Sequence, residues 1–242
     1  MIERFLLEAF IQVVGLALIA ILLVKTKAKE NYLRVLFFAL IFIVYQVALV
    51  LPRLVSGLNF FESNWNWEGK IFGIILGVIC YFVFRNYFAE NDFFTFRQNP
   101  ENKKKTWIVA ISVIVLMSVL YFFIGKSDFS AETLAFQLTM PGLDEEIMFR
   151  GILLGLLLTA LRERFLIFGN PAILLTAILF GFLHAFGLSK DYKLSFDIIS
   201  FLHTGIGGYV FAWLALRSES LFLPILTHGL TNFFAALATM LK

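Results

Sequence analysis

Long apolar runs dominate the chain, and short polar segments separate them. Of its 242 residues, 60% are apolar and only 15% are charged, whereas soluble domains carry about 25% charged residues. Because a membrane-spanning helix needs about 20 apolar residues, this pattern predicts one polytopic membrane domain, an all-α helical bundle, and excludes a soluble globule and a disordered chain. We expect eight transmembrane helices, at residues 5–24, 35–51, 71–84, 107–124, 139–161, 171–186, 198–216 and 221–241.

The basic residues predict how such a bundle is oriented. The net charge is +3, but the Lys and Arg residues lie in short loops between apolar runs, so we do not expect nucleic acid as a partner. With eight spans, twelve basic residues fall on one side: Lys25, Lys27, Lys29, Arg34, Arg85, Arg97, Lys103, Lys104, Lys105, Arg162, Arg164 and Arg217. Seven fall on the other: Arg4, Arg53, Lys70, Lys126, Lys190, Lys193 and Lys242. The positive-inside rule therefore places both termini outside the cytoplasm.

Three neighbouring carboxylates and one guanidinium lie where the fifth apolar run begins. We expect Pro141 to break any preceding helix and Asp144 to cap a new one. Glu146 and Arg150 are four residues apart, so they share a helix face and can pair in a low dielectric. Glu145 points about 100° away from that face and is free to act as a general base. Ionisable residues at membrane depth are costly, which makes this group a candidate site.

Two further polar motifs lie on separate apolar runs. Phe180 and His184 are four residues apart near the end of the sixth run, and His228 and Asn232 are four apart within the eighth. Polar side chains on three apolar helices can meet only inside the bundle. Carboxylates, imidazoles and an amide together suit activation of water and stabilisation of an oxyanion, which are the requirements of amide hydrolysis.

At these residues the chain resembles the CAAX prenyl endopeptidase and bacteriocin-processing proteins, the CPBP or Abi intramembrane proteases. The three family motifs occur in order, as Glu-Glu-x-x-x-Arg, Phe-x-x-x-His and His-x-x-x-Asn, and the similar region covers about residues 139–241. The matching positions are Glu145, Glu146, Arg150, Phe180, His184, His228 and Asn232. The longest polar segment, at residues 85–106, predicts the division of the chain: an N-terminal part at 1–106, with transmembrane helices and a basic loop, and a helical core at 107–242, which the resemblance implies is catalytic.

The resemblance implies an endopeptidase in which Glu145 and His184 polarise a water while His228 and Asn232 hold the oxyanion. Glu146 and Arg150, with Phe180, then serve the structure. The family is often labelled metalloprotease, and a zinc ion with Glu145, His184 and His228 as ligands is the alternative, although we favour a metal-free site because the chain has no His-Glu-x-x-His helix. His203 lies outside the family pattern and leaves the metal question open.

These features predict a multi-pass protein of a bacterial plasma membrane that cleaves a peptide or a membrane-anchored protein substrate. The alternative is a non-catalytic membrane adaptor or bacteriocin-immunity protein that binds a peptide or partner helix in the same interior. A proton-relaying transporter is a weaker third option, because no inverted repeat is visible. We interpret Glu8 and Gln12 as interhelical polar contacts, and the pairs Gly73/Gly77 and Gly151/Gly155 as close-packing surfaces.

Overall fold

The computed structural model describes residues 2–165 and 169–241, so Lys242 of the charge count lies outside it. Its α-helices are α1 (Ile2–Leu22), α2 (Lys29–Leu54), α3 (Trp67–Phe84), α4 (Lys103–Ile124), α5 (Ala131–Glu145), α6 (Leu154–Ala160), α7 (Pro171–Ala185), α8 (Ile198–Ser218) and α9 (Phe222–Met240). The shorter elements are the 3-10 turns η1 (Arg85–Tyr87) and η2 (Ala89–Asn91), the π-helix η3 (Glu146–Leu153), and the strands β1 (Phe186–Leu188) and β2 (Leu194–Phe196). All eight predicted apolar runs fall on helices, and the fold class is all-α.

The elements α5, η3 and α6 form one continuous helical rod, which corrects the expected break at Pro141. Pro141 lies inside α5, and the residues at both junctions keep right-handed helical dihedral angles. A proline removes its own N–H from the helix ladder and its ring crowds the carbonyl four residues earlier, but the tertiary packing on both sides of this rod outweighs that cost. Asp144 is consequently an interior residue of the rod and not a cap.

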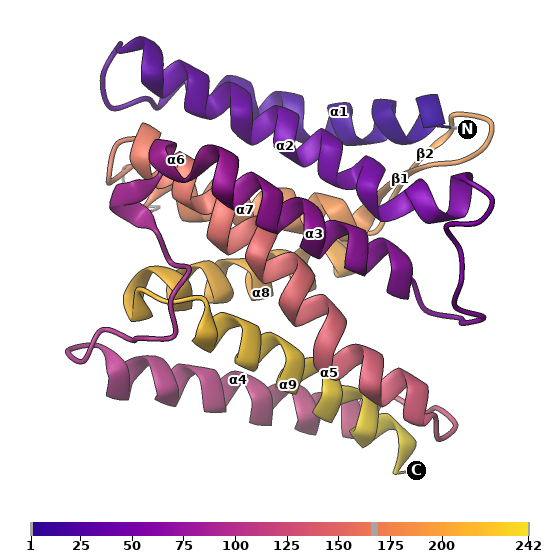
Figure 1. The fold of residues 1–242 in the computed structure, drawn as a ribbon. Helices are drawn as coiled ribbons and strands as arrows, with labels where there is room; N and C mark the ends of the chain where they lie inside the picture. Colours follow the sequence, from indigo (N-terminus) through magenta and orange to yellow (C-terminus); the bar gives the residue numbers. More distant parts are fainter. Residues whose placement is uncertain (1, 166–168, 242) are drawn as a thin grey trace.

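The rod runs obliquely through the bundle (Figure 1). The α1 and α2 pair lies at one side of the bundle and the α4 and α9 pair at the other, while α3 and α7 flank the rod between them. Aromatic rings pack where α2 meets the π-helix: Phe42 and Tyr45 are fully buried, and each ring packs edge-on against Phe149 at a centroid distance of 6.2 Å. This packing fixes the depth and rotation of the π-helix.

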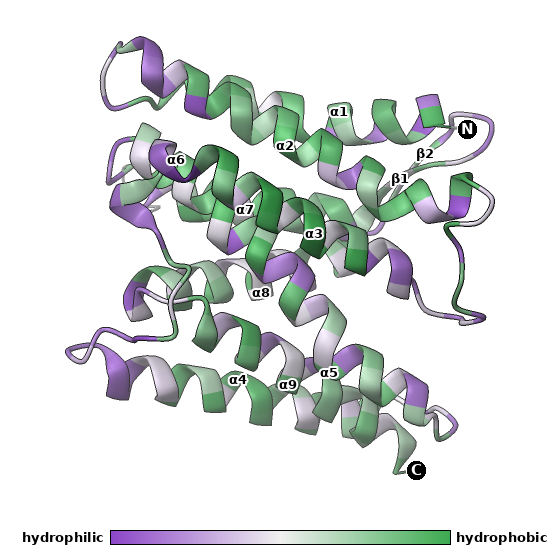
Figure 2. Cartoon of the chain, in the orientation of Figure 1, coloured by the Kyte–Doolittle hydropathy of each residue, from purple (hydrophilic) through white to green (hydrophobic). Residues whose placement is uncertain are grey.

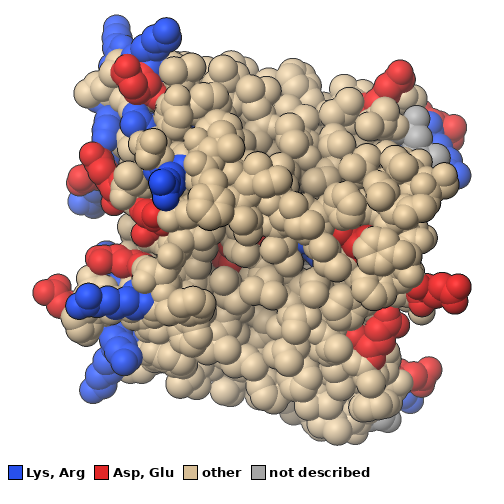
Figure 3. All heavy atoms as spheres, in the orientation of Figure 1, with Lys and Arg blue, Asp and Glu red and all other residues tan. Residues whose placement is uncertain are grey.

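The outer surface of the bundle suits lipid rather than water. Figure 2 shows apolar residues along the middle of the helices, and Figure 3 shows charged atoms mainly at the two ends of this face. Six helices of the described residues are long and apolar enough to span a membrane: Ile2–Leu22, Lys29–Leu54, Trp67–Tyr87, Lys103–Ile124, Ile198–Ser218 and Phe222–Met240. They indicate a multi-pass membrane protein. The predicted count of eight spans is not confirmed, because α7 has only 15 residues and the central rod is not among the six.

A short antiparallel hairpin follows α7, where we expected no strand. Its register pairs Phe186 with Phe196. Asp197 then caps α8 by accepting the amide N–H groups of Ile199 and Ser200, and the hydrogen bond from the Ser200 hydroxyl lowers the pKa of Asp197 below its ordinary value. The hairpin thus joins the end of α7 to a well-defined start of α8.

Polar side chains on one face of α1 hold this hairpin and the end of α7. Glu8 accepts the Leu188 amide at 2.8 Å, and Gln12 donates to the carbonyl oxygens of Phe182 and Phe186 at 3.4 and 3.3 Å. Gln12 therefore makes an interhelical contact through Phe182 of α7, as predicted, whereas Glu8 contacts strand β1 and not another helix. They anchor the segment on either side of His184.

Candidate active site

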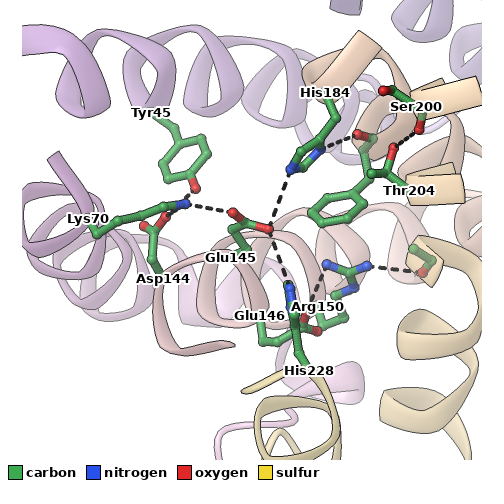
Figure 4. A network of polar contacts seen from close by, with 12 residues as sticks. Tyr45, Lys70, Asp144, Glu145, Glu146, Arg150, His184, Ser200, Thr204 and His228 are labelled. Atoms are coloured by element: carbon green, nitrogen blue, oxygen red, sulfur yellow. Dashed lines mark hydrogen bonds and ion pairs between the residues drawn. The ribbon is translucent and has the colours of Figure 1, made fainter. Parts of the chain in front are cut away.

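Glu145 lies at the centre of a polar cluster inside the bundle, at the junction of α5 and the π-helix (Figure 4). Its Oε1 accepts a hydrogen bond from the Lys70 ammonium at 2.6 Å. Its Oε2 lies 4.0 Å from Nε2 of His184 and 4.0 Å from Nε2 of His228. The two oxygens therefore have different environments: one is held by a cation, and the other faces two imidazoles at a distance too long for a direct hydrogen bond.

Both imidazoles are oriented by what their other ring nitrogen contacts. The Nδ1 of His184 lies 2.9 Å from the Phe180 carbonyl, an acceptor only, so this nitrogen carries the proton and donates it. The Nδ1 of His228 lies 2.7 Å from Glu146 Oε1 and donates to that carboxylate. Each Nε2 is consequently turned toward Glu145 Oε2. The His184 side chain is 33% exposed and that of His228 only 7%, so the cluster opens on the His184 side.

The predicted pairing of Glu146 with Arg150 is present and fully buried. Arg150 Nη1 lies 3.1 Å from Glu146 Oε1, and Nη2 donates to the Gly208 carbonyl at 3.1 Å. The guanidinium also lies over the rings of Phe180 and Phe211, with centroid distances of 4.5 and 5.4 Å. This ion pair fixes Glu146, which in turn orients His228, so it acts on the site through structure.

Two predicted site residues contribute in different ways. Phe180 packs against His184 and Arg150 and fills the space between them, with a centroid distance of 4.6 Å to the His184 ring. Asn232 lies one turn beyond His228 on α9 and is half-buried, and its side-chain amide makes no hydrogen bond to another described residue. His203 lies apart from the cluster, exposed on α8 beside the ring of Tyr121.

Sequence reasoning missed two members of the cluster, Tyr45 and Lys70, and interpreted a third, Asp144, as a helix cap. Asp144 Oδ2 accepts hydrogen bonds from the Tyr45 hydroxyl at 2.6 Å and from Lys70 at 2.8 Å, and Asp144 is fully buried. Lys70 had been counted as a loop residue. Lys70 shares a helix face with Gly73 and Gly77, and this pair of glycines marks a close contact with another helix. That pattern could have identified Lys70 from the sequence.

Glycines allow the helices to approach closely here. A Cβ at Gly73 would coincide with the Asp144 carboxylate, and one at Gly77 would lie 2.5 Å from the side chain of Ile147. On the other side of the rod, a Cβ at Gly142 would lie 2.8 Å from the Ile225 carbonyl of α9. The prediction that Gly73 and Gly77 form a close-packing surface is confirmed.

The cluster does not fit a metal ion. Zinc ligands lie about 2.0–2.2 Å from the metal and so about 3.4 Å from one another, whereas both imidazoles lie 4.0 Å from the carboxylate oxygen. The Lys70 ammonium on the same carboxylate opposes a second cation. No group of three His, Cys, Asp or Glu residues in the described ranges can hold a metal ion. We therefore assign no step to a metal.

Comparison with protein families gives a match over part of the chain. The model of the type II CAAX prenyl endopeptidase Rce1-like family matches residues 127–234, a segment that begins just before α5, ends within α9 and contains all three motifs. The resemblance seen in the sequence is thus confirmed over this segment. Neither a curated protein nor a solved structure matches the chain.

Proposed function

From the premise that residues 127–234 form a type II CAAX prenyl endopeptidase Rce1-like domain, we propose that this protein is an intramembrane endopeptidase. The observation that carries the proposal is the convergence of one carboxylate oxygen of Glu145 and the Nε2 atoms of His184 and His228, from three helices, at equal distances of 4.0 Å. A water between the carboxylate oxygen and an imidazole Nε2 would bridge the 4.0 Å gap that is too long for a direct hydrogen bond.

In the proposed reaction, Glu145 is the general base. It takes a proton from a water that the basic Nε2 of His184 helps to orient, and the hydroxide attacks the peptide carbonyl. The oxyanion is then held by Nε2 of an imidazolium at His228 and by the amide of Asn232. The Glu146 carboxylate at Nδ1 stabilises that imidazolium. Collapse of the tetrahedral species expels the amine, which receives the proton held by Glu145.

The membrane arrangement extends this proposal. We propose that the central rod and α7 also cross the membrane, which gives eight spans, and that the cytoplasm faces the end of the bundle that carries the basic loops. Both described chain ends lie at the opposite end of the bundle (Figure 1). The substrate would be a peptide or membrane-anchored protein, reached from the outer side of a bacterial plasma membrane, and no nucleic acid would take part. Residues 107–242 would form the catalytic core, and residues 1–106 the helices packed around it.

The test compares peptide termini in cells that contain the wild-type protein or Glu145→Gln at equal abundance. Mass spectrometry of membrane and secreted fractions is expected to show a small set of termini that Glu145→Gln loses. Glu163→Gln, the same exchange at an exposed position, is expected to retain them. Termini that are identical in the wild type, Glu145→Gln and His184→Ala would overturn the protease proposal in favour of a non-catalytic adaptor or immunity protein.

A further inference from the structure

Lys70 is a charged residue inside the bundle that the family motifs do not include. It lies on α3, outside the matched segment 127–234, in a helix long and apolar enough to span a membrane. Its side chain is only 12% exposed, and its ammonium contacts Asp144 Oδ2 at 2.8 Å and Glu145 Oε1 at 2.6 Å. A lysine in a membrane-spanning segment is costly, so an interior partner and a function are the default expectation.

The charges around the general base show what Lys70 does. The rod carries three consecutive carboxylates, at residues 144–146, inside the bundle. Arg150 compensates Glu146, while Lys70 is the cation in contact with both Asp144 and Glu145. Without that ammonium, two adjacent carboxylates in a low dielectric would compete for one proton, because like charges at close range disfavour joint ionisation.

We propose that Lys70 is a positioning residue for the general base: it holds Glu145 Oε1, so that Oε2 faces the two imidazoles in its proton-accepting form. The inference rests on the proposed endopeptidase function and adds a required residue from outside the recognised domain. Lys70 acts through Glu145, since its ammonium is occupied by the two carboxylates.

Tyr45 and Gly73 help to hold Lys70 and Asp144 together. The Tyr45 hydroxyl on α2 donates to the same Asp144 oxygen that Lys70 contacts, at 2.6 Å, so α2, α3 and the rod are joined at one atom. Tyr45 is fully buried against Phe149. The absence of a side chain at Gly73, three residues after Lys70, lets Asp144 approach α3. The N-terminal helices thus form one wall of the site.

Titratable and charged groups from several helices face this cluster. Those of the described residues are Tyr45 from α2, Lys70 from α3, Asp144 from α5, Glu146 and Arg150 from η3, His184 from α7 and His228 from α9. Among these groups Lys70 is the one whose charge contacts Glu145 directly, at 2.6 Å, whereas both imidazole nitrogens lie 4.0 Å from that carboxylate. Its removal should therefore affect Glu145 more than any other single neutralisation.

The experiment uses the full chain in lipid nanodiscs and an internally quenched peptide containing the cleavage site identified by the Glu145→Gln comparison. At pH 7, Lys70→Met is expected to lower kcat by about 100-fold, in the range of a lost general base, with KM nearly unchanged. Lys70→Arg should retain activity within about tenfold, since it keeps the cation. Cleavage by Lys70→Met should recover as the pH rises, because the Glu145 carboxyl group, which keeps a proton at pH 7 in this variant, is then ionised.

A double variant separates positioning from general destabilisation. In Lys70→Met/Asp144→Asn the competing carboxylate is also gone, so activity should be at least tenfold higher than in Lys70→Met alone. A purely structural role predicts the opposite, since each change adds to the loss. Thermal unfolding of each variant in the same nanodiscs identifies any that fail to fold, and Lys70→Arg then serves as the folded comparison.

The outcomes distinguish this inference from the function it rests on. If Glu145→Gln abolishes cleavage while Lys70→Met keeps wild-type kcat at pH 7, Lys70 has no positioning role and the protease proposal stands. If Lys70→Met loses activity equally at all pH values and the double variant is no better, the role is structural and the inference is overturned. If Glu145→Gln cleaves as well as the wild type, both proposals fail.

Discussion

Removing Arg150 alone should be far more damaging than removing it together with its partner. Arg150 and Glu146 are 1% and 0% exposed in their side chains, and Glu146 Oε2 has no hydrogen-bond partner in the described residues. In Arg150→Met the buried Glu146 carboxylate is left with His228 only, and breaking such a pair costs about 3–5 kcal/mol. Loss of the guanidinium from between the aromatic rings adds about 1 kcal/mol, so we expect a total near 4–6 kcal/mol.

The matched comparison is Glu146→Gln/Arg150→Met. A glutamine keeps an acceptor for His228 Nδ1 and carries no charge, so the double variant should lose only about 1–3 kcal/mol. The free energy of unfolding can be measured by titration with a denaturing detergent from mixed micelles, for the wild type, both single variants and the double variant. A cost below about 1 kcal/mol for Arg150→Met, or a double variant that equals the sum of the single ones, would refute the reasoning.

Three further predictions follow from single features. Gly73→Ala places a methyl group on the Asp144 carboxylate and should cost about 1–3 kcal/mol of unfolding free energy together with most of the cleavage activity, whereas Gly207→Ala, with its nearest contact at 4.0 Å, should be neutral in both assays. A chelator of divalent metals should leave peptide cleavage unchanged, and a loss that zinc restores would show that the site binds a metal after all. Hydrogen bonds from Ser200 lower the pKa of Asp197. The stabilisation that Asp197 gives by capping α8 is therefore present above its unfolded-state pKa and is lost as the pH falls through its folded-state pKa. Faster exchange of the Ser200 amide at acid pH, absent in Asp197→Asn, would show this.

Spacing along the sequence predicted which side chains of the three motifs share a helix face and turn into the bundle. Glu146 and Arg150, four apart on one helix, pair as expected, and Glu145 does point to a different face. The meeting of His184 and His228 followed from the rule that polar side chains on apolar helices turn inward. Their roles in catalysis stay predictions until the variants are measured.

The residues that escaped prediction depend on packing between distant parts of the chain. Lys70 and Glu145 are 75 positions apart, and Tyr45 and Asp144 are 99 apart, so no local pattern pairs them. Pro141 was predicted to end a helix because isolated propensity disfavours proline inside one. The contacts of the rod with its neighbours override that preference, as they also do for the irregular winding at residues 146–153.

The π-helix sets the rotation of the two halves of the rod, α5 and α6, relative to each other. A π turn contains one more residue in each hydrogen-bonded ring than an α turn does. If the same residues were wound as a regular α-helix, the halves would rotate relative to each other by about 100°, the angle contributed by one residue. Either the Lys70 contacts of Glu145 or the packing of Gly151 against Phe94 would then be lost. The wider π turn takes up one residue more than an α turn does, and so keeps both halves of the rod facing their partners.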